Sequence, residues 1–422
     1  MIRESLLKKC LHALGPGLVT GASDDDPSGI GTYSQVGAQF GFGMLWTMLF
    51  SYPLMVSIQL ICARIGRVTG HGVAGNLRRY YPAWLLYPIV LLLLIANTIN
   101  IGADLGAMSA ALHLLVGGPV GWYTAAFGVT SALLQVFVPY HYYVRVLKCL
   151  TLALFAYVAT VLVIHIPWLT VAKETLLPAL SFKSEYVTAV VAILGTTISP
   201  YLFFWQASQE VEDQEAAPTE HPLKQAPSEA PKQLARIKLD TWIGMGLSNF
   251  VAFFIILTTA VTLFAHGVTN IDSASKAAEA LRPIAGNFAF FLFAAGIIGT
   301  GLLAIPVLAG SAAYGVGEAL KWITGLEKTL AQAHGFYAVI VLATLAGVGM
   351  NYSGINPIKA LFWTAVINGV IAVPILVVIM LMAVRPKIMG AFVVSRRLLM
   401  VGWLTTVVMG LSVIGMLITW PK

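Results

Sequence analysis

Long apolar runs recur from one end of this 422-residue chain to the other, and they limit its fold more than any other feature. Crossing the hydrocarbon core of a bilayer as a helix takes about 20 mostly apolar residues. Charged residues make up only 10% of the sequence, against about 25% in soluble domains. The alternating segments of about ten residues that are typical of a membrane β-barrel do not occur. The chain is therefore predicted to be an all-α polytopic membrane protein.

Hydrophobic runs and the breakers between them predict eleven membrane spans. The spans are placed at residues 12–35, 40–65, 83–115, 119–139, 144–166, 189–212, 239–266, 286–316, 336–350, 356–384 and 395–420. Residues 1–166 then hold the first five spans, 189–384 the next five and 395–420 the eleventh. The segment 209–238 is instead rich in Glu, Lys, Pro and Gln, and we expect a flexible cytoplasmic loop there.

Lysine and arginine gather in the N-terminal segment and in the even-numbered connections, which predicts that these lie on the cytoplasmic side. They are Arg3, Lys8, Lys9, Arg64, Arg67, Arg78, Arg79, Arg145, Lys148, Lys224, Lys232, Arg236, Lys238, Arg385, Lys387, Arg396 and Arg397. We therefore expect the protein to lie in the plasma membrane, with its N-terminus cytoplasmic and its C-terminus extracellular. This distribution also explains the net charge of +7 without a nucleic-acid partner.

The first span contains three consecutive aspartates, Asp24, Asp25 and Asp26, followed by Pro27 and Gly29. Carboxylates are costly in lipid, so these side chains must face protein or a water-filled cavity. Because Pro27 donates no backbone hydrogen bond and glycine weakens a helix, we expect the helix to unwind here. Freed carbonyl oxygens beside carboxylates make a cation site. Consecutive helical residues point in different directions, so the three cannot all face one ion, and Asp26 is the predicted ligand.

A matching break occurs in the sixth span, where small and polar residues from Gly195 to Ser199 precede Pro200. Pro27 and Pro200 hold corresponding places in two blocks of five spans, which have opposite orientations in the membrane because five is odd. Such a pair of interrupted helices is typical of an inverted-repeat transporter whose binding site lies where the breaks meet. For Pro200 taken alone, a kink without function is the alternative.

These motifs resemble the Nramp family of divalent metal transporters. The resemblance covers essentially the whole chain and rests on Gly15-Pro16-Gly17, on the break at Asp26-Pro27-Ser28-Gly29 and on the break at Ser199-Pro200. It implies a LeuT-like fold of two inverted five-helix repeats plus an eleventh helix, with helices 1 and 6 broken at the midplane. It also implies transport of divalent cations by alternating access.

The family's first break usually reads Asp-Pro-Gly-Asn and its second Met-Pro-His. The family's aspartate falls on Asp26 and is kept, whereas its asparagine falls on Gly29 and its methionine on Ser199. Its carbonyl ligand falls on Thr196. These departures resemble the Nramp-related magnesium transporter branch of the family. The metal-site residues implied are Asp26, Gly29, Ser199, Thr196 and Ser23.

The departures agree with the chemistry of a hard cation. Thioether sulfur favours softer metals, while carboxylate, carbonyl and hydroxyl oxygens suit Mg2+ and Mn2+. Mg2+ gives up water reluctantly and usually keeps several waters beside one or two carboxylates. Gly29 and Ser199 remove bulk as well as ligands, so a wider cavity with only oxygen ligands is expected to accept a partly hydrated ion. Mg2+ is the predicted substrate, and Mn2+ is also compatible.

The resemblance also bears on proton coupling. The family's two histidine positions fall on Tyr201 and Gln206, and one acidic position of its proton route falls on Ile101. Tyrosine, with a reference pKa near 10, relays protons poorly at neutral pH. Uncoupled transport is therefore expected, with Asp104 as the residue that most threatens this expectation. A proton-coupled Mn2+ or Fe2+ transporter is the alternative.

Further polar residues at membrane depth form a second set of candidates for the cavity and pathway. Asn97, Asn100 and Asp104 recur on one helical face, and an ordinary interhelical hydrogen bond is the alternative for each asparagine. The complete second set is Asp24, Asp25, Ser28, Tyr201, Gln206, Asn97, Asn100, Asp104, Asn249, Thr364 and Asn368.

Two other functional classes fit parts of the pattern. A membrane prenyltransferase holds Mg2+ and a diphosphate with acidic motifs. Such an enzyme needs a second acidic cluster and basic residues that face the first cluster, and the sequence shows neither. An amine permease of the same fold would tolerate the aspartates. The expected partners are the divalent cation and the lipid bilayer, with no cofactor, no enzymatic activity and no obligate protein partner.

Overall fold

The computed structural model describes residues 15–138, 151–217 and 219–420, and every regular element in these ranges is a helix. Nine segments of the described chain are long and apolar enough to cross a membrane. The pair formed by α2 and α3 supplies a further, interrupted span. The predicted all-α membrane fold is confirmed.

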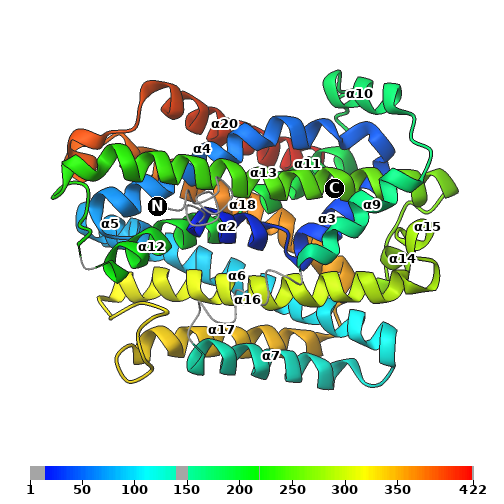
Figure 1. Ribbon diagram of the computed structural model, residues 1–422, viewed down its shortest axis with the longest axis horizontal. Coiled ribbons are helices and arrows are strands. Elements are labelled where there is room, and N and C mark those ends of the chain that lie inside the picture. The colour runs from blue at the N-terminus through cyan, green and yellow to red at the C-terminus, as the bar shows by residue number, and fades with distance from the viewer. Residues whose placement is uncertain (1–14, 139–150, 218, 421–422) are drawn as a thin grey trace, which may run out of the picture.

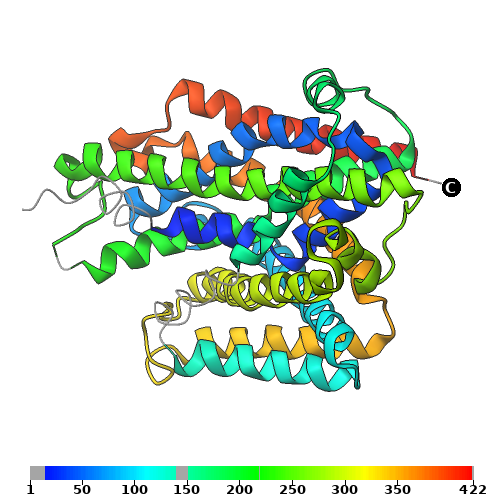
Figure 2. The same ribbon diagram turned by 45° about the vertical axis from the view of Figure 1, so that its right-hand side comes forward.

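The long helices lie side by side in layers (Figure 1). In Figures 1 and 2, α7 and α17 form one outer layer, α6 and α16 lie next to it, and α4, α13 and α20 cover the opposite side. The broken helices and α18 lie between these layers. The long helices are α4 (Trp46–Thr69), α6 (Ala83–Val116), α7 (Val120–Phe137), α13 (Ala230–Thr262), α16 (Ala289–Leu320), α17 (His334–Met350), α18 (Pro357–Ala383) and α20 (Arg396–Thr419).

Short helices fill the connections. They are α5 (Val73–Tyr80), α9 (Phe155–Val163), α10 (Trp168–Leu176), α14 (Ala274–Glu279), α15 (Arg282–Ala285) and α19 (Pro386–Met389). The predicted fifth span, 144–166, is described from residue 151 onward as a 3-10 turn followed by α9, and its beginning lies outside the described residues. Residues Arg3, Lys8, Lys9, Arg145 and Lys148 also lie outside them.

Both predicted helix breaks are present. The first span is α2 (Pro16–Asp24) followed by α3 (Pro27–Phe40). The sixth is α11 (Ser184–Thr197) followed by α12 (Pro200–Ala216). In each case proline occupies the first turn of the second helix, where its missing N–H leaves no bond unmade. The residue before it has extended backbone, as a following proline favours.

Glycine allows α2 to lie unusually close to α13. A Cβ on Gly21 would stand 2.1 Å from the carbonyl oxygen of Gly244, and one on Gly244 would stand 2.1 Å from that of Gly17. Because these neighbours are backbone atoms, they cannot rotate away. The first broken helix is therefore held against α13 by backbone contact.

The expectation of a flexible loop over 209–238 is wrong for most of that segment. Helix α12 continues to Ala216, and α13 begins at Ala230. The connection is tied to α4 because the Arg67 guanidinium is buried and pairs with Glu220. Gln233 Nε2 also donates to Glu220 Oε1, at 2.8 Å. A buried arginine requires such a partner, which composition alone does not reveal.

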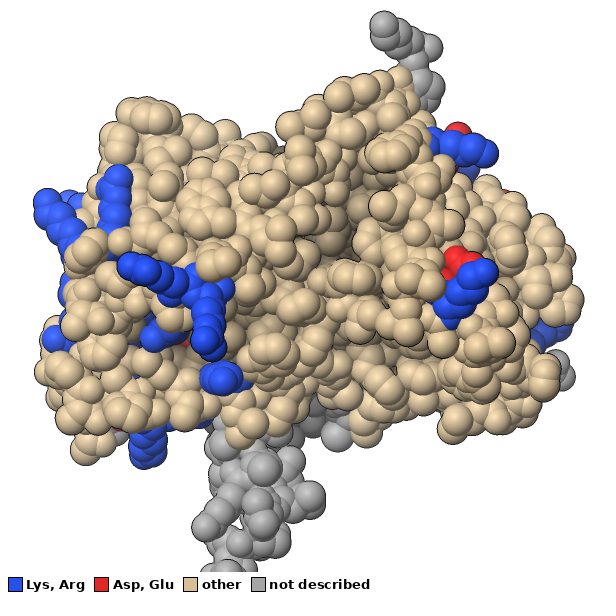
Figure 3. All heavy atoms as spheres, turned by 90° about the horizontal axis from the view of Figure 1, so that it is seen from above, with Lys and Arg blue, Asp and Glu red and all other residues tan. Residues whose placement is uncertain are grey.

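Basic side chains gather at one end of the molecule. Figure 3 shows most of the Lys and Arg on this face at the left-hand end, where α5 and the start of α20 lie in Figure 1. The predicted even-numbered connections that the structure describes meet at this end. The other end carries a few cations, among them Lys276, which pairs with Asp272 at 2.8 Å.

Candidate functional site

Asp26 and Gly29 form the centre of the candidate site, where α2 gives way to α3. Asp26 caps α3: its Oδ1 accepts a hydrogen bond from Gly29 N at 2.6 Å. A Cβ placed on Gly29 would stand 3.0 Å from the carbonyl oxygen of Asp24, 3.1 Å from Thr196 Oγ1 and 3.4 Å from Asp26 Oδ1. Three oxygens from the two broken helices therefore surround one point beside the Gly29 backbone.

The second break supplies hydroxyl and carbonyl groups to the same region. Ser199 Oγ donates to Gly195 O at 2.6 Å and to Thr196 O at 2.9 Å. Thr196 and Ser199 are 3% and 1% exposed, and Asp26 is 2% exposed. The predicted residues of both breaks are thus brought together in an enclosed place. Because the Ser199 hydroxyl donates its proton to carbonyls at the end of α11, its oxygen lone pairs remain available to a cation.

The side chains of Asp24 and Asp25 both contact Ser248 of α13. Ser248 Oγ lies 2.6 Å from Asp24 Oδ2 and 3.2 Å from Asp25 Oδ1. Asp24 Oδ1 has no hydrogen-bond partner. In the described part of the chain, no three His, Cys, Asp or Glu side chains converge to hold a metal ion. The oxygens nearest the point beside Gly29 are those of one carboxylate, one backbone carbonyl and one hydroxyl.

Tyr201 and Gln206 connect the two broken helices. Tyr201 Oη donates to the carbonyl of Ser23 at 2.8 Å, while the Ser23 hydroxyl donates to Val19 O within α2. Thr20 Oγ1 donates to Gln206 Oε1 at 2.5 Å. Both side chains at the family's histidine positions thus hold α12 against α2.

Helix α18 closes another side of the site. Ser28 Oγ lies 2.9 Å from Thr364 Oγ1 and 3.0 Å from Leu361 O. Asn368 is buried one turn further along α18. Ser28 and Thr364 therefore line the candidate site, and their contact connects α18 to the first helix break.

The three polar residues of α6 differ from one another. Asn97 Nδ2 donates to Leu308 O of α16 at 2.8 Å, which is the ordinary interhelical bond. Both side-chain polar atoms of Asn100 lack a partner. Asp104 is fully buried and close enough to Asp26 for their charges to interact. Asp104 therefore stands out as a fully buried carboxylate close to Asp26 and to the backbone of Ser28.

Asn249, by contrast, lies away from the site. It is only half-buried, and its Nδ2 donates to Met48 O of α4 at 3.0 Å. Its neighbour Ser248 is the residue of α13 that meets the aspartates. Along a helix, adjacent residues point about 100° apart, so a shift of one position decides which of them faces the site.

Sequence reasoning also missed Asp240. Its carboxylate accepts hydrogen bonds from the backbone N–H groups of Gly15, Gly17 and Leu18, at 2.9, 2.6 and 3.1 Å. It therefore caps α2 from a neighbouring helix. The signal available in the sequence was an acidic residue at the start of an apolar span.

Comparison with solved structures identifies the fold. A manganese transporter from Eremococcus coleocola, in complex with an aromatic bis-isothiourea substituted compound, matches 99% of this chain and 87% of its own, with a TM-score of 0.75 and 16% identity. The nucleobase-cation-symport-1 family transporter Mhp1, in a closed conformation, matches 96% of this chain and 92% of its own, with a TM-score of 0.54 and 13% identity. These likenesses concern the fold, which is LeuT-like, with two inverted five-helix repeats and an eleventh helix.

Sequence comparison identifies the family. A divalent metal cation transporter, MntH, of Deinococcus radiodurans is 24% identical over 416 residues, covering 95% of this chain and 88% of the relative. MntH of Yersinia pestis is 24% identical over 314 residues, covering 71% of each. The family model "Natural resistance-associated macrophage protein-like" matches residues 17–419. The chain belongs to this Nramp family, whose members are metal transporters and not enzymes.

Proposed function

We propose that this protein transports divalent metal cations by alternating access and without proton coupling, with Mg2+ as its main substrate and Mn2+ as a second one. The observation that carries the proposal is the set of oxygens around Gly29. One carboxylate, one backbone carbonyl and one hydroxyl surround the point where a side chain would begin. Asp26, Gly29, Thr196, Ser199 and Ser23 are the residues we assign to the metal site.

The ligand set supports a hard cation. Carboxylate, carbonyl and hydroxyl oxygens suit Mg2+ and Mn2+, whereas the sulfur ligand that favours softer metals is replaced by Ser199. A single carboxylate beside neutral oxygens matches the way Mg2+ binds proteins, through few direct contacts and retained water. The same departures favour the magnesium branch of the family.

A second candidate is a proton-coupled transporter of Mn2+ or Fe2+. The names of the sequence relatives, divalent metal cation transporters, and of a structural relative, a manganese transporter, fit it at least as well. Asp104 also favours it, since a second fully buried carboxylate lies close to Asp26, where a proton could be carried beside the metal.

The lack of histidine at the two positions where the family has it argues against proton coupling. Tyr201 and Gln206 hold the broken helices together through hydrogen bonds, and neither is a proton carrier at neutral pH. The membrane potential supplies enough energy without protons. A divalent ion gains about 4.6 kcal/mol per 100 mV, inside negative, which is twice the single-charge value.

The membrane setting follows from the charges. The basic end of the molecule is proposed to face the cytoplasm of a plasma membrane, and the end where α3 finishes and α18 begins to face outward. In this orientation the N-terminus is cytoplasmic and the C-terminus extracellular.

Metal uptake into proteoliposomes tests the substrate. With a fixed potential, Mg2+ and Mn2+ should enter, and the comparison includes Ca2+ and Fe2+. Asp26→Ala should abolish uptake, whereas Asp272→Ala, which removes an exposed aspartate, should not. Near-normal Mg2+ flux in Asp26→Ala would refute the site. Uptake of an alkylamine instead of metal would favour the permease.

A pH-sensitive dye inside the same vesicles tests coupling. Uncoupled transport predicts metal entry with no acidification of the lumen. Acidification that scales with metal flux and vanishes in Asp104→Asn would overturn the uncoupled mechanism and favour the second candidate.

A further inference from the structure

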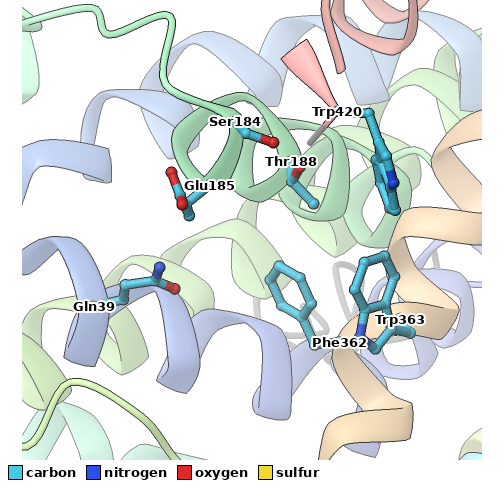
Figure 4. A pocket seen from close by; sticks show the side chains of 7 residues that line it. All are labelled: Gln39, Ser184, Glu185, Thr188, Phe362, Trp363 and Trp420. Atoms are coloured by element: carbon cyan, nitrogen blue, oxygen red, sulfur yellow. The ribbon is translucent and has the colours of Figure 1, made fainter. Parts of the chain in front are cut away.

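A pocket of about 310 Å3 lies at the end of the molecule where α3 finishes and α11 and α18 begin. Figure 4 shows its wall: Phe362 and Trp363 of α18, Trp420 after α20, and the polar residues Gln39, Ser184, Glu185 and Thr188. In this view the two tryptophans stand on one side, and Glu185 and Gln39 on the other. The pocket combines an aromatic wall with a carboxylate.

The aromatic rings form a corner. The ring centroids of Trp363 and Trp420 are 5.7 Å apart with an interplanar angle of 58°, and those of Phe362 and Trp363 are 6.0 Å apart at 86°. Trp363 and Trp420 are 45% and 44% exposed, so their faces are open to a ligand. Aromatic faces attract cations, and tryptophan does so most strongly.

Among the residues that the structure describes, Glu185 is the only charged one that lines the pocket. It is exposed and forms no ion pair with the described residues. Gln39 accepts a hydrogen bond from Gln35 through its Oε1, which leaves its amide N–H groups available to an acceptor. The pocket therefore offers one negative charge, an aromatic corner and uncharged donors.

An apolar groove of about 520 Å3 continues from this pocket along α18 and α20. Trp363 and Trp420 line both cavities. The rest of the groove is lined by Val366, Ile367, Val370, Ile371, Met416 and Leu417. The groove lies on spanning helices and contains no polar lining residue except the two indoles, so it suits a hydrocarbon chain.

We propose that pocket and groove together bind one phospholipid whose head group ends in an ammonium, such as a phosphatidylethanolamine. The ammonium lies between Glu185 and the tryptophan faces, the phosphate accepts hydrogen bonds from Gln39 and Ser184, and an acyl chain fills the groove. An anionic head group without an ammonium is disfavoured because Glu185 repels it and none of the described residues that line either cavity is a Lys or Arg. The site does not depend on the proposed metal specificity.

Native mass spectrometry of the purified, delipidated protein tests the proposal. The protein is incubated with phosphatidylethanolamine or with phosphatidylglycerol carrying the same acyl chains, and retained lipid is counted. Phosphatidylethanolamine should be retained about five- to tenfold better, as expected for a cation–aromatic contact and an exposed charge pair acting together. Glu185→Gln should lower the ratio to about two- to threefold, because the cation–aromatic contact remains, and Trp363→Leu should lower it by a similar factor.

Matched variants control for general effects. Glu174→Gln removes a carboxylate near Tyr186, at the same end of the molecule but outside the pocket, and Trp122→Leu removes an exposed tryptophan of α7. Both should leave the ratio unchanged. Equal retention of the two lipids by the parent protein, or a preference that neither Glu185→Gln nor Trp363→Leu reduces, would refute the proposal. So would release of the retained phosphatidylethanolamine by an equal concentration of free tetramethylammonium, because the ligand would then be a soluble cation.

Discussion

Gly29→Ala is the most direct probe of the candidate metal site. The added methyl carbon would stand 3.0 Å from the carbonyl oxygen of Asp24 and 3.1 Å from Thr196 Oγ1, against 3.4 Å or more for an ordinary contact. The Thr196 hydroxyl can turn away, but the Asp24 carbonyl is backbone and must shift by a few tenths of an ångström. The methyl group therefore occupies the space between the proposed ligands.

The size of the effect follows from these contacts. Overpacking a tight site by one carbon costs about 1–3 kcal/mol. Without metal, the Asp24 carbonyl and the Thr196 hydroxyl can move away from the new methyl group. Metal binding requires them to move back, so most of this free-energy cost weakens metal binding. At 1.4 kcal/mol for each factor of ten, the affinity for Mg2+ should fall by roughly ten- to a hundredfold.

The assay is calorimetric titration of Mg2+ into the purified variant, together with flux into proteoliposomes. Gly349→Ala is the matched control, since a Cβ there meets nothing within 4 Å. It should bind and transport as the parent does. If Gly29→Ala elutes as a folded monodisperse protein and still binds Mg2+ with unchanged affinity, the ion does not lie beside Gly29 and the reasoning is wrong.

Three further changes test other contacts. Ser199→Met with Gly29→Asn restores the family's usual ligands and should shift preference from Mg2+ toward Mn2+, and an unchanged ratio in competitive titration would contradict the ligand argument. Asp240→Ala removes three hydrogen bonds to the start of α2 and should lower stability by about 1–2 kcal/mol, measured as a lower melting temperature. Glu220→Ala leaves the buried Arg67 unpaired and should cost about 3 kcal/mol. Partial burial raises the pKa of Glu220, but hydrogen bonding and charge from Arg67 outweigh it and hold that pKa below its usual value of 4.5. The parent protein should therefore keep this contribution at neutral pH and lose it as the pH falls through that lowered pKa, whereas the variant's stability should lack this acid-dependent loss.

Much of the fold could be read from the sequence because membrane helices obey a simple rule. A span must be apolar over its whole length and must satisfy its own backbone groups, so both the spans and their interruptions leave local marks. Pro27 and Pro200 begin α3 and α12 as those marks predict. The prediction of a flexible loop over 209–238 failed because composition does not encode long-range contacts such as the ion pair between Arg67 and Glu220.

The sequence by itself determined that the chain is a helical membrane protein, where its first and sixth spans break, and that an aspartate and small polar residues lie at those breaks. Only the tertiary structure decided which aspartate faces which partner: Asp26 lies beside Gly29 and Thr196, while Asp24 and Asp25 meet Ser248. The physical reason is that hydrophobic length and proline act locally, within one helix. The direction of a side chain and its hydrogen-bond partner depend on how helices far apart in the chain pack together.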